Sequence, residues 1–317
     1  MDVNNNPDNP IIGVRSYGAD PELVAQMGAA AIRGYQQTGI LACAKHFPGH
    51  GDTAVDSHLA LPTIWGDRER LEQIEFVPFR SAIAAGVGAI MTTHIVFPAL
   101  DAHRPATISP AILTGLLRQE LGYDGLVITD CLEMKAIADT VGTARGAVEA
   151  LKAGADMVLI AHTLEVQREA VEAIRQAVES GDLPEHRLNE AVSRVLAAKQ
   201  RFVTTQPPAE GTPWLDPAHD ALEERIARAS ITVVKHSPAG FPLRTERRTV
   251  LISAHHSLPT LAQQMRRYQP DLLELPIAPH FPSEQVGDCL RKAKEAEQCV
   301  IATSPPEPWS DTPIDQQ

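Results

Sequence analysis

Short apolar runs alternate with longer amphipathic segments along the first two thirds of the chain. The runs hardly alternate with polar residues, as expected of strands covered on both faces, whereas the longer segments repeat apolar residues with helical spacing. Strands are predicted at residues 40–45, 88–93, 125–129 and 156–160, and helices at residues 21–37, 67–85, 110–121, 143–153, 164–180 and 185–201.

Capping residues, glycines and prolines mark where several of these helices begin and end. Asp20 and Ser109 each precede a proline, which gives an N-cap residue followed by the residue favoured at the first helical position. Gly39 is expected to end the first helix, and Pro78 is expected to kink or interrupt the second.

The order of strand then helix, repeated four times, predicts parallel strands joined by right-handed crossovers, in a barrel or in a doubly wound sheet. The barrel is favoured because Lys45-His46, His94 and Asp130 follow strand ends, where barrel active sites are built. A doubly wound sheet usually carries a glycine-rich phosphate turn, and the sequence has none. The predicted fold class is therefore α/β, the C-terminal part of a (β/α)8 TIM-like barrel, preceded by a strand stub at residues 2–4.

The composition changes after the last of these helices. Residues 204–213 are rich in threonine and proline and read as part of a linker. A new alternation follows, which predicts a second, smaller α/β domain with strands at Thr232 and at residues 249–252 and 299–302, and helices at residues 260–267 and 283–297. The predicted division is a partial barrel domain at 1–203, a linker at 204–220 and a partial C-terminal domain at 221–317.

The segment from Lys45 to Pro62 carries most of the titratable groups that stand directly after a strand. Such groups are costly to fold unless each finds a partner or stays in water, so function is the favoured explanation. Two alternatives remain at this point, a solvated surface loop and a metal site. The spacing matches no compact helical histidine pattern. The segment holds His46, His50, Asp52, Asp56 and His58.

Length, composition and charge narrow the class of protein. The chain has 317 residues, 44% of them hydrophobic, which is typical of a globular protein with room for two domains. Its net charge of -12 argues against a nucleic-acid partner, and no apolar run is long enough to span a membrane. The four cysteines are spread too widely to indicate a zinc knuckle or a disulfide framework.

Three motifs in this order resemble glycoside hydrolase family 3. They are R-S-Y-G from Arg15, K-H-F-P-G-H-G-x4-D-S-H from Lys45, and I-T-D-C-L-E-M from Ile128. The D-S-H ending is similar to that of the β-N-acetylglucosaminidase (β-hexosaminidase) branch. The resemblance implies a barrel followed by an α/β sandwich domain, and the removal of terminal β-linked N-acetylglucosamine with retention of configuration, mostly from peptidoglycan fragments.

The resemblance also implies roles for single residues. Asp130 corresponds to the nucleophile, and His58, held and charged by Asp56, to the general acid and base. A histidine beside a carboxylate suits that role, because it can donate a proton near neutral pH. Asp130 as a mere helix N-cap and Arg15 as a surface ion-pair residue are the plainer alternatives. The substrate-binding candidates are Arg15, Lys45 and His46 from the resemblance, with His94 expected to line the pocket.

The sequence departs from the family pattern in having too few strands for a closed barrel. We therefore expect a chain truncated at both ends, without the first strands. Besides hydrolysis, two functions stay open, a glycoside phosphorylase of the same branch and an inactive carbohydrate-binding remnant. No cofactor or metal is expected. The expected partner is an N-acetylglucosamine-containing glycan or muropeptide, and the two-domain type favours a secreted or cell-wall-associated location, with the cytoplasm as the alternative.

Overall fold

The computed structural model describes residues 1–54, 61–203, 217–235, 242–254, 259–277 and 283–303. Its contacts divide the chain into two compact units, residues 1–208 and 209–317. Each unit is described by itself below.

The first unit is built on a parallel sheet of four strands. These are β1 (Cys43–Phe47), β2 (Ala89–Thr92), β5 (Leu126–Cys131) and β6 (Met157–Leu159). Their spatial order, β1-β2-β5-β6, follows the order of the chain without a reversal, and every neighbouring pair is parallel. Sequential order is what a barrel requires, whereas a doubly wound sheet reverses at its switch point. The predicted barrel-type fold is therefore confirmed.

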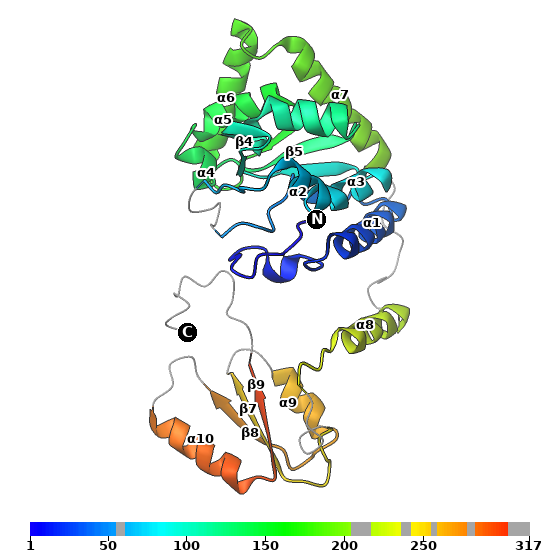
Figure 1. Cartoon of the computed structure of the whole chain (residues 1–317), viewed down its shortest axis with the longest axis vertical. Helices are drawn as coiled ribbons and strands as arrows, with labels where there is room; N and C mark the ends of the chain where they lie inside the picture. Colours follow the sequence, from blue (N-terminus) through cyan, green and yellow to red (C-terminus); the bar gives the residue numbers. More distant parts are fainter. Residues whose placement is uncertain (55–60, 204–216, 236–241, 255–258, 278–282, 304–317) are drawn as a thin grey trace. The chain divides into compact units, whose positions relative to one another are not determined.

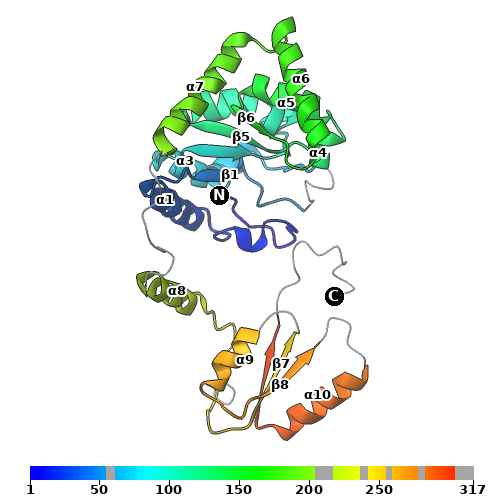
Figure 2. The same ribbon diagram turned by 180° about the vertical axis from the view of Figure 1, so that it is seen from behind.

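Helices follow each strand and pack around the sheet (Figure 1, and from behind in Figure 2). Asp20 caps α1 by accepting a hydrogen bond from the Leu23 N–H at 2.7 Å, as the sequence predicted. Helix α1 packs against α3, and α5 against α6. The helical segments are η1 (Gly13–Arg15), α1 (Pro21–Gln37), α2 (Arg68–Gln73), α3 (Phe76–Ala84), η2 (Ala106–Ile108), η3 (Ala111–Glu120), α4 (Lys135–Ala138), α5 (Thr143–Ala153), α6 (Leu164–Ser180) and α7 (Glu185–Phe202).

Large aromatic and branched side chains fill the space between the sheet and its helices. Phe47 of β1 and Phe79 of α3 are fully buried and meet edge to face, with their ring centroids 5.1 Å apart. The core around them includes Phe76, Phe97, Ile90, Ile112, Leu113 and Leu117. This packing fixes the strand ends on which polar side chains stand.

Some predicted elements differ from the observed ones. The first strand begins at Cys43 rather than residue 40, and it is not covered on both faces, because Cys43 and Lys45 are exposed on an edge strand. Residues 2–4 form no strand. The helix predicted at 67–85 is two helices, α2 and α3, and Pro78 lies in the first turn of α3, where its missing N–H has no cost. A short antiparallel pair was missed, β3 (Val96–Phe97) and β4 (Asp101–Pro105).

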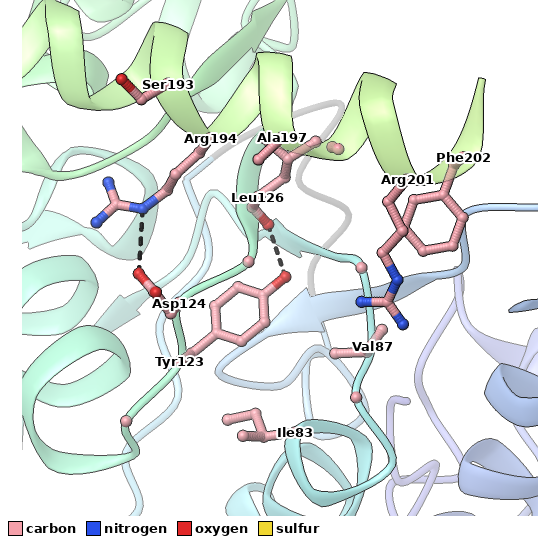
Figure 3. A pocket seen from close by; sticks show the side chains of 15 residues that line it. Ile83, Val87, Tyr123, Asp124, Leu126, Ser193, Arg194, Ala197, Arg201 and Phe202 are labelled. Atoms are coloured by element: carbon pink, nitrogen blue, oxygen red, sulfur yellow. Dashed lines mark hydrogen bonds and ion pairs between the residues drawn. The ribbon is translucent and has the colours of Figure 1, made fainter.

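A cavity of about 520 Å³ lies at the amino ends of β2 and β5 (Figure 3). Gly88 and Leu126 border it from the sheet, and the last turns of α7 cover it with Arg201 and Phe202. The buried Tyr123 hydroxyl donates to the Leu126 carbonyl at 2.9 Å beside it. In barrels this end of the sheet serves stability, and the chemistry takes place at the other.

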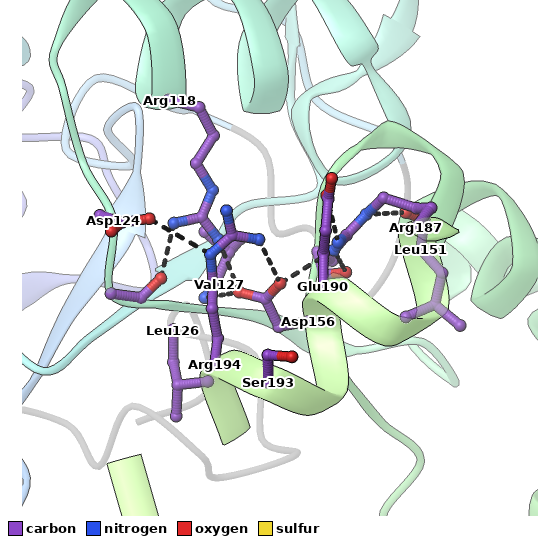
Figure 4. Close-up of polar contacts among 12 residues, drawn as sticks. Arg118, Asp124, Leu126, Val127, Leu151, Asp156, Arg187, Glu190, Ser193 and Arg194 are labelled. Atoms are coloured by element: carbon purple, nitrogen blue, oxygen red, sulfur yellow. Dashed lines mark hydrogen bonds and ion pairs between the residues drawn. The ribbon is translucent and has the colours of Figure 1, made fainter. Parts of the chain in front are cut away.

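A buried carboxylate holds three elements together at the same end (Figure 4). The Asp156 side chain is fully buried before β6 and accepts hydrogen bonds from Arg118 of η3 at 2.6 Å and from Arg187 of α7 at 2.8 Å. Arg194 of α7 adds a third contact at 3.3 Å, and the Val127 N–H donates at 3.0 Å. The charged side chain of Asp156 therefore links the sheet to η3 and α7.

The second unit has a three-stranded parallel sheet in the order β8-β7-β9. Its elements are α8 (Pro217–Ser230), β7 (Thr249–Ala254), α9 (Pro259–Arg266), β8 (Leu273–Ile277), α10 (Ser283–Glu295) and β9 (Gln298–Ala302). The predicted strand at Thr232 is wrong, since the neighbouring Val233 and Val234 are exposed without a strand partner among the described residues. Residues 217–220, predicted as linker, belong to α8, and residues 204–216 lie outside the described residues. The division into a barrel domain and a sandwich domain stays a prediction.

None of the described helices combines the length and the apolar character that crossing a bilayer requires. The four cysteines are free, and Cys43 and Cys299 are exposed.

Candidate active site

Asp130 stands at the carboxyl end of β5, as the sequence predicted. Its Oδ1 accepts a hydrogen bond from the Cys131 backbone N–H at 2.8 Å. Its Oδ2 lies 3.7 Å from Nε2 of His46, which is beyond hydrogen-bond distance. The side chain keeps 24% of its surface exposed, so the carboxylate is partly accessible.

The neighbouring strand β1 contributes Lys45 and His46, whose side chains differ in exposure. Lys45 is exposed, whereas the His46 ring is buried. The Lys45–His46 and Phe47–Pro48 peptide bonds are cis. The structure thus brings His46 and Asp130 together from β1 and β5, which are separated in the sheet by β2.

Asp2 was missed by the sequence prediction. Its buried carboxylate accepts three hydrogen bonds from residues of β1 and of the loop that follows it. Oδ1 accepts from the backbone N–H groups of His46 and His50, both at 2.9 Å, and Oδ2 lies 2.8 Å from His46 Nδ1. An aspartate in an otherwise polar Asn-rich segment gives no sign that it is buried, and so the sequence alone could not reveal this contact.

His94 follows β2 and is buried, with both ring nitrogens engaged. Nε2 lies 3.0 Å from the Cys131 carbonyl oxygen, and Nδ1 lies 2.8 Å from the Thr107 hydroxyl. Burial lowers the pKa of His94 to about 4, although the nearby Asp130 acts in the opposite direction, and the ring is therefore neutral at pH 7. Because a carbonyl only accepts, we assign the proton to Nε2. His94 thus holds the peptide next to Asp130, and its role as a pocket-lining residue stays a prediction.

Asn9 ties the segment after β1 to the one that carries Arg15. Its side-chain nitrogen donates to the carbonyls of His50 and Gly51 at 2.9 and 3.0 Å, and its oxygen accepts from the Ile11 and Ile12 N–H groups. Arg15 ends the short helix η1 with an exposed side chain whose Nε donates to the Ile11 carbonyl at 3.0 Å. The side chain of Asn9 therefore joins the segment after β1 to the segment that carries Arg15.

Arg70 of α2 holds the same segment from another side. It forms ion pairs with Asp52 at 2.8 Å and with the buried Glu75 at 3.1 Å. Glu75 packs closely against Gly49. A Cβ atom added at residue 49 would lie 2.6 Å from the Cγ of Glu75. Asp52 thus has a partner within the protein.

Asp56 and His58, the predicted acid and base pair, lie outside the described residues. The metal alternative gains no support from the described members of the same segment. His46 and His50 contact Asp2 and Thr53 through Nδ1, and Asp52 pairs with Arg70. No group of three or more potential metal ligands occurs among the residues that the structure describes.

Consecutive parallel βα units with a carboxylate and histidines at the strand ends define a barrel-type protein with a polar site at the carboxyl edge of its sheet. Residues 1–198 match the family described as the Glycosyl hydrolase family 3 N terminal domain. The chain belongs to glycosyl hydrolase family 3, as its motifs indicated.

Individual relatives agree with this membership. The chain is 34% identical over 297 residues to "Beta-hexosaminidase A" of Pseudoalteromonas piscicida, covering 87% of this chain and 50% of that protein. It is 35% identical to "Beta-N-acetylglucosaminidase/beta-glucosidase" of Cellulomonas fimi, and the match covers 78% of this chain and 46% of that protein. The solved structure of a family 3 β-N-acetylglucosaminidase from Paenibacillus sp. str. FPU-7 superposes with a TM-score of 0.86 at 42% identity, covering 95% of this chain and 60% of the other. The chain spans about half the length of the curated relatives it matches.

Proposed function

We propose that the protein is a retaining β-N-acetylhexosaminidase that removes terminal β-linked N-acetylglucosamine from glycans or peptidoglycan fragments. The observation that carries the proposal is the Asp130 carboxylate at the end of β5, with Oδ1 held by the Cys131 N–H and Oδ2 beside His46. Family membership and the similarity to proteins named β-hexosaminidase support the reaction and the substrate class.

The proposed reaction has two displacements at the anomeric carbon. First, Asp130 Oδ2 attacks that carbon, its bond to the aglycone oxygen breaks, and His58 gives a proton to the departing oxygen. Water then attacks the same carbon, the bond to Asp130 breaks with its electron pair returning to the carboxylate, and His58 takes up a proton from the water. Two inversions restore the original configuration.

The roles of His58 as acid and base and of Asp56 as its partner rest on the motif resemblance alone. A histidine in place of a second carboxylate suits this task, since its charge changes near neutral pH and a neighbouring carboxylate orients the ring. A carboxylate at Asp56 would also favour the protonated ring that the first step needs.

Arg15, Lys45 and His46 are proposed to bind the sugar. The side chains of Arg15 and Lys45 are exposed and charged, which suits donation of hydrogen bonds to hydroxyl groups. For His94 the contacts support a different role, because its Nε2 donates to the Cys131 carbonyl and its Nδ1 faces Thr107. We propose that His94 positions the Cys131–Leu132 peptide, directly after Asp130, rather than touching the substrate.

The test is an assay of the 317-residue chain with p-nitrophenyl β-N-acetylglucosaminide and the corresponding β-glucoside, each with and without phosphate. We expect far faster release from the N-acetylglucosaminide, and free sugar as the product whether or not phosphate is added. Equal rates on the two glycosides would reject this branch of the family. A sugar phosphate would indicate the phosphorylase, and binding of N-acetylglucosamine without turnover would indicate a carbohydrate-binding protein.

A further inference from the structure

Asp2 is a buried carboxylate that the proposed reaction does not use. Its side chain is 6% exposed, and it satisfies three donors of one segment, the N–H groups of His46 and His50 and the His46 ring. Burial raises the pKa of such a carboxyl group, but the neighbouring His46 ring, with a smaller effect from His50, acts in the opposite direction, and the pKa of Asp2 lies well below its usual range. Asp2 is therefore ionised and can only accept hydrogen bonds.

This acceptor decides where His46 carries its proton. Because Oδ2 of Asp2 lies 2.8 Å from Nδ1, the short contact requires a proton on Nδ1. The other ring nitrogen, Nε2, then faces Oδ2 of Asp130 at 3.7 Å. The ring cannot turn over without placing a carbon atom against the Asp2 carboxylate, so one contact fixes both its orientation and its tautomer.

We propose that Asp2 is a positioning residue of the active site. It holds the proton of His46 on Nδ1, and it thereby presents Nε2 to the reacting carboxylate and to the sugar bound beside it. Its part in catalysis rests on the proposed function, whereas its control of the His46 tautomer does not.

The variant Asp2→Asn removes the negative charge of this side chain and keeps its shape. The backbone N–H groups of His46 and His50 both need an acceptor, which keeps the amide oxygen at the Oδ1 position and turns the amide nitrogen toward His46 Nδ1. A ring nitrogen facing an amide N–H must accept, and the proton of His46 therefore moves to Nε2. The side-chain volume is almost unchanged, so the fold has no reason to be lost.

Asp101→Asn is the matched control. Asp101 of β4 also accepts three hydrogen bonds, from the His103 and Arg104 N–H groups at 3.0 and 3.2 Å and from the Ser109 hydroxyl at 2.7 Å. None of these partners belongs to the proposed site, and the same substitution there should leave His46 unchanged.

The experiment is long-range ¹H–¹⁵N correlation NMR of the ¹⁵N-histidine-labelled chain, in which His46→Gln identifies the signals of His46. We expect a protonated Nδ1 in the wild type and in Asp101→Asn, and a protonated Nε2 with an unprotonated Nδ1 in Asp2→Asn. A wild-type spectrum with unprotonated Nδ1, or an unchanged tautomer in Asp2→Asn, would overturn the inference even if the enzyme is active.

The catalytic part is tested by steady-state rates on the p-nitrophenyl N-acetylglucosaminide. Asp2→Asn should lower kcat about a hundredfold, as misplacement of a site group does, with KM changed much less and Asp101→Asn at the wild-type rate. An unchanged kcat in Asp2→Asn would reject the positioning role. Absence of wild-type turnover would reject the proposed function instead, and the NMR result would stand on its own.

Discussion

Single side chains at the carboxyl end of the sheet differ in which of their polar atoms remain available. Asp130 has a partly exposed carboxylate, whereas His94 has both ring nitrogens in contact with protein groups. His46 has Nδ1 at Asp2 and presents Nε2 to Asp130. The motif could predict that these residues gather, because each follows a parallel strand. It could not predict which ring nitrogens have protein partners, because that depends on side-chain contacts with Asp2 and Thr107, which lie outside the motifs.

Glu75 makes a contribution to the stability of the fold that depends on pH. Burial raises its pKa to about 7, although Arg70 acts in the opposite direction. In the unfolded chain its pKa is near 4.5, so the folded state binds the proton more tightly. The contribution of Glu75 to stability is therefore fully present below pH about 4.5 and is lost as the pH rises through about 7.

We predict that the stability of the wild type relative to Glu75→Gln decreases between pH 5 and pH 8, because glutamine stays neutral throughout. The measurement is the urea midpoint of both proteins at the two pH values. Comparing the two proteins cancels the titration of the other carboxylates. A difference between them that is the same at both pH values would contradict the raised pKa of the buried Glu75.

The elements were predicted best where local signals and burial agree. The bounds of α5 and α6 were predicted correctly, and both helices have one apolar face against the sheet or a neighbouring helix. Strand β8 was missed because its sequence, L-E-L-P-I, contains Pro276, which weakens a strand pattern. It lies at the edge of its sheet, where a missing N–H is tolerated. The β3–β4 pair was missed because a two-residue strand has no detectable period.

The contact of Asp156 with η3 and α7 gives a prediction for the elements it joins. Asp156→Asn keeps the shape and the acceptor for Val127 but removes the charge that three arginines share. Leaving buried guanidinium groups without their partner should lower the free energy of unfolding of the first unit by about 3–5 kcal/mol.

The measurement for Asp156→Asn is urea unfolding followed by circular dichroism. The control is Glu172→Gln on α6, which removes one carboxylate from an exposed ion pair with Arg175 and should leave the midpoint unchanged. Equal shifts of the midpoint in the two variants would show that the buried charge of Asp156 stabilises the protein no more than the exposed charge of Glu172.

At the scale of the whole chain, the order of strands and helices was sufficient to predict the barrel-type fold of the first unit. Sequential pairing follows from the strand-helix repeat, since each crossover brings the next strand beside the last. The start of the second unit was less predictable. Helix α8 has no buried side chain, so its pattern carries no signal of packing.

The central claim is that Asp130 is the nucleophile of a retaining hydrolysis. The most direct test incubates the chain with a fluorinated N-acetylglucosaminyl donor that carries a good leaving group, and then maps the modified peptide by mass spectrometry. We predict a mass increase of one glycosyl unit on the peptide containing Asp130, and none in Asp130→Asn. Two results would contradict the assignment of Asp130 as the nucleophile. One is turnover of the donor with the label on another residue, and the other is turnover with no covalent adduct and a product of inverted configuration.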